Sequence, residues 1–128
     1  MKSIEQTYEI NAPVEKVWQA LTDPNIINDW GGGPAVIEAK PDTEFEYWGG
    51  DIHGKNTEVV ENEKLVQEWF SGDWPEPSIC TFELSQKGDS TTVRLTHTNI
   101  PDHEADDIET GWQDYFMGPL KELLEKKP

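Results

Sequence analysis

The stretch LTHTNIPDHEADDIETGWQDYFMGPLKELLE, residues 95–125, decides the fold. Its first residues alternate apolar and polar side chains, which predicts the end of a strand. After Pro101 the apolar residues recur every three or four positions, the spacing of one helix face. These residues are Ile108, Trp112, Tyr115, Phe116, Leu120, Leu123 and Leu124. We therefore predict a long C-terminal helix with one apolar face and a kink at Gly118-Pro119.

The chain before this stretch begins with a strand and two short helices. Residues 3–10 alternate, with Ile4 and Ile10 on one face, which predicts a strand with one solvated side. Pro13 then fits the start of a helix. Asp23-Pro24 has the form of an N-cap followed by the first helical residue, so a second short helix is expected to run to about Trp30.

A series of short strands is predicted between these helices and the C-terminal one. Gly31-Gly32-Gly33-Pro34 breaks the chain, and strand signals follow at 35–40, 43–48, 52–61, 65–71, 78–85 and 91–98. Turn residues separate them closely, which indicates antiparallel hairpins. The predicted fold is α+β: a curved antiparallel sheet of about six to seven strands around a long C-terminal helix. We expect residues 1–128 to form a single domain.

Charge and cysteine content exclude several classes of function. The chain has 10 basic and 26 acidic residues, a net charge of −16. A surface this negative repels phosphate backbones and anionic membranes, so we expect no nucleic-acid binding and no membrane insertion. Cys80 has no partner for an internal disulfide, and no Cys/His spacing suggests a metal site. We expect a cytoplasmic protein without a cofactor.

The sheet and the helix together predict an apolar pocket. Strand parity and helix spacing place one set of side chains toward the space between them. The candidate ligand-cavity residues are Phe45, Tyr47, Gln67, Trp69, Phe82, Leu95, His97, Trp112, Tyr115 and Phe116. Aromatic side chains with a few polar groups are typical of small-molecule sites. The alternative interpretation is that the same side chains simply fill the core.

Catalysis has weak support in the sequence. His97 is the one candidate base, and it has no carboxylate nearby to orient it, so it can equally be a satisfied structural histidine. His53 and His103 are expected on the surface. No nucleophile, zinc or phosphate-binding motif is present, and Cys80 is interpreted as a small buried group. We therefore expect a protein that is not an enzyme.

Tryptophans beside loops are a further candidate feature. Trp30, Trp48 and Trp74 lie next to predicted turns. Aromatic residues at such places can mark a pocket mouth or a partner surface, or they can fold back onto the core.

Three segments resemble one known family. APVEKVWQALTDP (12–24), SGDWPEPSICTFEL (71–84) and residues 95–125, with their IP…GW..Y..GPLK pattern, are similar to the activator of heat-shock protein 90 ATPase homologue family. That family belongs to the START/Bet v 1-like (SRPBCC) superfamily. The resemblance implies a helix-grip fold over nearly the whole chain, and it points to the stand-alone members, which consist of this domain without a preceding one.

Three functions compete, the first indicated by the aromatic residues between the sheet and the helix and the other two implied by the resemblance. The first is a non-catalytic domain that binds a small hydrophobic ligand between the sheet and the C-terminal helix. The second is a co-chaperone that binds heat-shock protein 90 and stimulates its ATPase, or another protein partner. The third is an enzyme of the cyclase or hydrolase type, with His97 as its titrating group.

Overall fold

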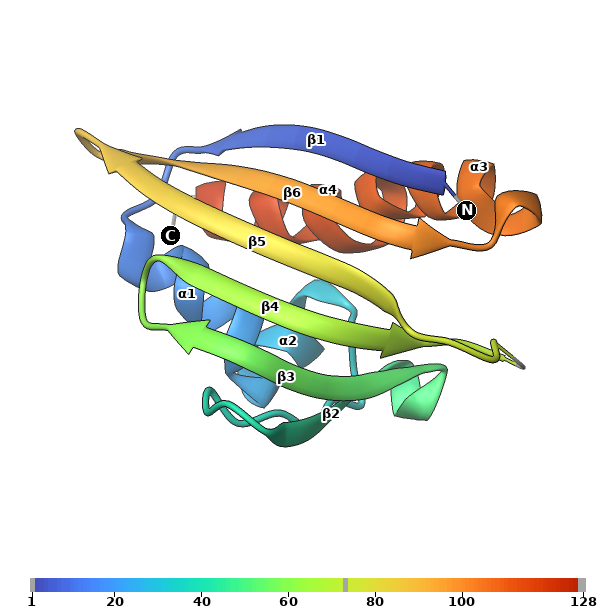
Figure 1. Ribbon diagram of the computed structural model, residues 1–128. Coiled ribbons are helices and arrows are strands. Elements are labelled where there is room, and N and C mark those ends of the chain that lie inside the picture. Colours follow the sequence, from blue (N-terminus) through green and yellow to red (C-terminus); the bar gives the residue numbers. More distant parts are fainter. Residues whose placement is uncertain (1, 73, 127–128) are drawn as a thin grey trace.

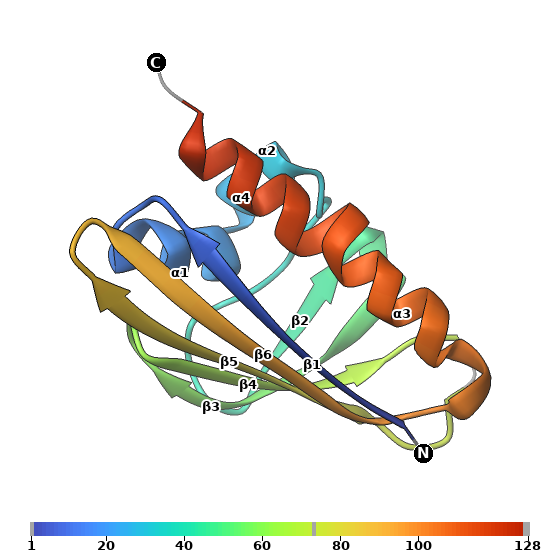
Figure 2. The same ribbon diagram turned by 90° about the horizontal axis from the view of Figure 1, so that it is seen from above.

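One antiparallel sheet carries all the helices on one of its faces (Figure 1, Figure 2). The computed structural model describes residues 2–72 and 74–126. The first elements are β1 (Lys2–Ile10), α1 (Val14–Thr22), α2 (Pro24–Trp30), β2 (Thr43–Tyr47) and the 3-10 turn η1 (Trp48–Gly50). The remaining strands are β3 (Ile52–Val60), β4 (Lys64–Phe70), β5 (Ser78–Lys87) and β6 (Ser90–Ile100).

The C-terminal helix is continuous but changes its winding. It consists of the 3-10 turn η2 (Asp102–Glu104), α3 (Ala105–Gly111), the π-helical turn η3 (Trp112–Met117) and α4 (Gly118–Glu125). Within the described part of the chain, no helix has both the length and the apolar character needed to cross a membrane.

The sheet has six strands in the order β1-β6-β5-β4-β3-β2. The predicted strand at 35–40 is wrong. Val36 alone pairs with Glu46, through two backbone hydrogen bonds of 3.0 and 2.8 Å. Pro34 stands before the segment and cannot donate a ladder hydrogen bond, and the Lys40 N–H turns back to the Glu38 carbonyl at 2.9 Å. The chain therefore leaves the sheet after one bridge.

The C-terminal helix lies in the hollow of the curved sheet, as predicted (Figure 2). Alternation along β5 buries Cys80, Phe82 and Leu84 on the helix side of the sheet. The Phe82 ring centroid lies 5.7 Å from that of Trp112 and 5.8 Å from that of Phe116. These contacts join the helix to the middle of the sheet.

The glycine run closes α2. Asp23 caps the start of this helix, because its Oδ1 accepts a hydrogen bond from the Asn25 N–H at 2.9 Å. At the other end Gly31 has φ 102°, a left-handed conformation that favours glycine. The Gly32 N–H then bonds the Ile27 carbonyl at 2.9 Å. This cap turns the chain sharply toward the sheet.

The interruption expected at Gly118-Pro119 takes the form of the π turn. Pro119 has no N–H to donate to the preceding turn, and the Gly118 N–H bonds the Gln113 carbonyl five residues back. A Cβ on Gly118 would lie 2.1 Å from the Gln113 oxygen, so the π turn requires glycine there. The close approach of Gly118 is therefore to the preceding turn of its own helix.

Candidate functional site

An apolar groove lies between the C-terminal helix and the turn that joins β2 to β3. Its volume is about 210 Å³. The groove is lined by Trp48, Ile52, Trp69, Asp107, Ile108, Gly111, Trp112, Tyr115 and Phe116. Aromatic rings and isoleucines dominate this lining, which is the chemistry of a small-molecule site.

The helix supplies one wall through its 3.6-residue period and the π turn that interrupts it. Ile108 and Trp112 are four residues apart and share a face. In η3 the hydrogen bonds span five residues, so Phe116 and Met117 stack below Trp112 and are buried. Tyr115 is thereby rotated off the buried face. Its side chain is 68% exposed, and it lies on the groove rim instead of pointing into the sheet as predicted.

The floor of the groove consists of packed rings. Trp69 is on the inner face of β4, two residues beyond the buried Gln67. Its ring centroid lies 4.8 Å from that of Trp112, which in turn lies 4.7 Å from that of Phe116. Such tilted contacts are favourable aromatic geometries. They hold the three rings in place when the groove is empty.

Trp48 is fixed at the rim by the glycine cap of α2. Its backbone N–H bonds the Gly32 carbonyl at 2.8 Å, and its indole N–H bonds the Gly31 carbonyl at 2.8 Å. Trp48 has φ 51°, a left-handed conformation that is rare for a bulky residue and costs about 1–3 kcal/mol. Such strain is concentrated at functional sites. The surrounding hydrogen bonds hold this conformation.

His97 is held as a neutral side chain below the groove. The Trp112 indole N–H donates to His97 Nδ1 at 3.0 Å. Nδ1 is therefore the acceptor, Nε2 carries the proton, and Nε2 donates to Ser78 Oγ at 2.7 Å. Burial disfavours the charged imidazolium and lowers the pKa of His97 to about 4. This geometry gives His97 the task of orienting Trp112.

Gln67 joins a second set of buried polar groups. Its amide nitrogen donates to Tyr47 Oη at 3.1 Å and to Asn56 Oδ1 at 3.0 Å. Its carbonyl oxygen accepts from the Trp69 indole N–H at 2.7 Å. Burial also raises the pKa of Tyr47, which keeps its hydroxyl neutral. The network therefore fixes the Trp69 ring from behind.

The predicted cavity residues divide into two groups. Trp69, Trp112, Tyr115 and Phe116 line the groove. The others lie in the packed interior away from its lining: Phe45, Tyr47, Gln67, Phe82, Leu95 and His97. The space between sheet and helix is thus mostly filled by rings, and the opening lies toward one end of it.

The groove is also lined by residues outside the predicted set, and the sequence pointed to some of them by weaker signals. Trp48 was one of the aromatic residues beside loops, and Ile108 was on the predicted helix face. Strand alternation could have identified Ile52 as inward-facing, because its neighbour His53 points to the exposed face of β3. Asp107 had no signal that set it apart from the many other acidic residues.

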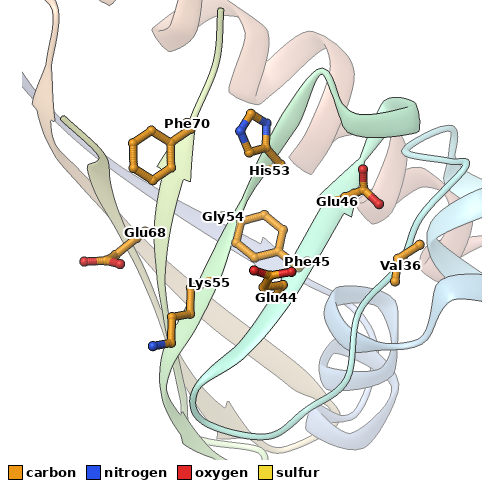
Figure 3. Close-up of a pocket in the computed structure, with 9 residues that line it drawn as sticks. All are labelled: Val36, Glu44, Phe45, Glu46, His53, Gly54, Lys55, Glu68 and Phe70. Carbon is orange, nitrogen blue, oxygen red and sulfur yellow. The ribbon is translucent and has the colours of Figure 1, made fainter. Parts of the chain in front are cut away.

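A second hollow lies on the outer face of the sheet, with a volume of about 560 Å³ (Figure 3). Glu44, Lys55 and Glu68 face one another across β2, β3 and β4. His53 stacks on Phe70 in the next row, with ring centroids 5.9 Å apart. Opposite charges in register stabilise neighbouring strands, so these side chains are accounted for by the solvated face of the sheet.

Metal and thiol chemistry have no assembled site in the described residues. Residues 2–72 and 74–126 contain no group of three or more His, Cys, Asp or Glu side chains placed to hold a metal ion. Cys80 is fully buried, and burial raises the pKa of its thiol. The thiol is therefore held in its neutral, unreactive form.

Comparison with known proteins shows the family of this chain. Residues 11–125 match the family described as Activator of Hsp90 ATPase homolog 1-like protein. The chain belongs to this family. The fold agrees, because the crystal structure of PFC0360w, described as an HSP90 activator from Plasmodium falciparum, has a TM-score of 0.86 at 30% identity. That match covers 97% of this chain and 96% of the other.

Other similar proteins match this chain over very different shares of their own length. The solution structure of the Aha1 dimer from Colwellia psychrerythraea has a TM-score of 0.81 at 26% identity, covering 98% of this chain and 97% of that one. Activator of 90 kDa heat shock protein ATPase homolog 2 of Mus musculus is 28% identical over 114 residues, which are 88% of this chain and 34% of the mouse protein. The chain spans about a third of the length of the curated relatives it matches.

Proposed function

We propose that this member of the family is a non-catalytic binding domain that holds a small hydrophobic ligand in the apolar groove. The observation that carries the proposal is the groove itself, in which five aromatic side chains and two isoleucines converge on about 210 Å³. The indole rings are already positioned by hydrogen bonds and ring contacts. A preformed site avoids much of the cost of ordering side chains on binding.

A fluorescence titration tests this proposal. Trp48, Trp69 and Trp112 line the groove, so a bound apolar compound should change the tryptophan emission saturably. Suitable probes are small flavonoids and the neutral compound phenylbutanol. A complete absence of saturable change across such a panel contradicts the proposal.

Two isoleucine variants localise the signal. Ile108→Ala removes a half-buried side chain from the groove wall and should weaken binding by about tenfold, since it removes roughly 1–2 kcal/mol of apolar contact. Ile26→Ala is the matched control, because Ile26 is also a half-buried helical isoleucine but lies outside the lining. Equal losses in the two variants would place the ligand elsewhere.

The non-catalytic part of the proposal is supported by His97. Both of its ring nitrogens are engaged in hydrogen bonds, and the residue does not line the groove. A general base must reach the proton that it removes. If a hydrolase or cyclase activity were found, its loss in His97→Ala but not in Ser78→Ala would contradict this assignment.

A chaperone function is the second candidate, favoured by family membership. The relative from Plasmodium falciparum, 30% identical over nearly the whole of both chains, is described as an HSP90 activator. The net charge of −16 suits a basic surface on a partner. The test is the ATPase rate of the heat-shock protein 90 from the same source with and without this protein. No binding at low salt and no change in rate would exclude this function.

A further inference from the structure

We propose that Gly111 sets the size of the ligand, because its missing side chain leaves room in the groove for an apolar body of about eight carbons. The inference rests on the ligand-binding function proposed above. Gly111 is the last residue of α3 and lines the groove from the side of the C-terminal helix. It acts on specificity through the space that it leaves open.

The local backbone gives no reason for a glycine at this position. Gly111 has φ −61° and ψ −34°, an ordinary right-handed helical conformation that any residue adopts. A Cβ added there would meet only the Tyr115 side chain, at 3.9 Å, which is an ordinary van der Waals contact. Glycine within a helix is also less stable than alanine. Neither conformation nor packing therefore requires glycine at position 111, in contrast to Gly118.

The free space of the groove lies beside Gly111. Trp69, Trp112 and Phe116 are nearly fully buried and pack against one another, so they form a closed floor. A Cβ at position 111 would lie beside the Tyr115 ring, which also lines the groove, and would therefore occupy part of the space above this floor. The half-buried members of the lining border this space: Trp48, Ile52, Ile108 and Gly111.

The volume and the chemistry of the groove define the ligand. An engineered apolar cavity of about 150 Å³ holds one benzene molecule, and by the same ratio the groove, at about 210 Å³, holds about eight carbons. Pockets for drug-sized molecules start at about 300 Å³. The lining is almost entirely apolar, and Asp107 does not present its carboxylate to it. A short alkyl chain or a single substituted ring therefore fits, with any polar end left in water.

A series of straight-chain alcohols tests the size limit. The probes are butanol, hexanol, octanol and decanol, and calorimetry measures their affinities. We expect the affinity to rise by about twofold to fourfold for each added methylene up to octanol. It should then level off, because further methylenes stay in water. An affinity that keeps rising at the same rate through decanol contradicts the limit of about eight carbons.

Two substitutions of Gly111 test its role in setting that limit. Gly111→Ala should lower the affinity for octanol by about twofold to fourfold, since one methyl group takes the place of one ligand carbon. Gly111→Leu fills more of the groove, so it should lower this affinity by about tenfold or more and make the series level off at a shorter alcohol. Neither variant should lower the melting temperature, because both residues form helix better than glycine.

Thr110→Ala is the matched control for these variants. Thr110 is the neighbouring exposed residue of α3 and does not line the groove. Alanine there also improves helix propensity, so the melting temperature should not fall. The affinity for octanol should stay that of the wild type.

The outcomes separate this inference from the function on which it rests. If octanol binds the wild type and both Gly111 variants equally, Gly111 does not set the size of the ligand, while ligand binding stands. Equal losses in Gly111→Ala and Thr110→Ala would trace the effect to the helix as a whole and would also overturn the inference. If none of the alcohols binds the wild type, the ligand-binding function fails together with it.

Discussion

His97 accepts a hydrogen bond from Trp112 and donates one to Ser78, so folding favours its neutral form. Its pKa falls to about 4 from an ordinary value of 6.5. In the range between these values the unfolded chain binds a proton that the folded chain does not. The contribution of neutral His97 to the free energy of unfolding is therefore fully present above pH 6.5 and is lost as the pH falls toward 4. Between about pH 7.5 and 5.0 the loss should be about 2 kcal/mol.

Urea unfolding at the two pH values measures this effect, and variants separate it from the titration of carboxylates. His97→Gln should lose stability at neutral pH but show a decrease toward acid that is smaller than that of the wild type by about 2 kcal/mol. His53→Gln, at an exposed position, should retain the wild-type pH dependence. Identical pH profiles for the wild type and His97→Gln would contradict the buried neutral histidine.

Gln67 carries the second prediction at the residue scale. Gln67→Leu removes three hydrogen bonds and leaves the Trp69 indole N–H and Asn56 Oδ1 without this buried partner. The free energy of unfolding should fall by about 2–4 kcal/mol, since each unsatisfied buried group costs about 1–3 kcal/mol. Gln19→Leu, at an exposed position of α1, should change it by less than about 0.5 kcal/mol. Denaturant unfolding compares the two variants.

Strand parity predicted which of these side chains face inward, but not their partners. Cys80, Phe82, Leu95 and His97 alternate with polar residues, and all four are buried. The hydrogen bond between His97 and Trp112 depends on where along β6 the C-terminal helix packs against the sheet. That position is set by the packing of the whole domain, so no local stretch of sequence predicts it. The sequence alone therefore does not distinguish a satisfied His97 from a reactive one.

At the element scale, the two glycines of the C-terminal helix should respond to alanine in opposite ways. A Cβ on Gly111, at helical φ −61°, would meet only Tyr115 at 3.9 Å. Gly111→Ala should therefore stabilise the protein by about 0.5–1 kcal/mol through helix propensity. Gly118→Ala should destabilise it by about 1–3 kcal/mol, because its Cβ would collide with the Gln113 carbonyl. Thermal unfolding of both variants tests the π turn, and equal shifts would contradict it.

The element predictions succeeded where periodicity was long and failed where it was short. The C-terminal helix and β1 each have sustained patterns, and both are present. Residues 35–40 give a strand signal of only six positions, and a local turn and flanking prolines outweigh it. The π turn moved Tyr115 outward because one widened turn rotates all later positions, which a uniform 3.6-residue period cannot anticipate.

At the scale of the whole molecule, the charge of −16 predicts an unusual dependence on salt. Like charges about 10 Å apart repel by about 0.4 kcal/mol in water, and many such pairs act together. The ion pairs that include Lys55–Asp42 and Arg94–Glu5 are exposed and offset little of this repulsion. Raising the ionic strength from about 0.01 to 0.15 M should therefore raise the melting temperature. A fall would show that exposed ion pairs dominate.

The groove is the feature that the sequence predicted least well. Composition and parity indicated aromatic residues between sheet and helix, but the volume left between them depends on how each ring tilts against the next. Phe82 and Phe116 close the middle of the space, and Trp48 opens its end by a left-handed backbone conformation. Neither detail has a sequence signature beyond the glycines that accept hydrogen bonds from Trp48.

The central claim is that the groove beside the C-terminal helix receives an apolar ligand. Methyl NMR of isoleucine-labelled protein tests it most directly, with phenylbutanol as the probe. We predict saturable shifts of the Ile52 and Ile108 methyl signals, while Ile79 on the outer face of the sheet stays unchanged. Shifts confined to Ile79, or saturable binding that leaves Ile52 and Ile108 unmoved, would contradict the account.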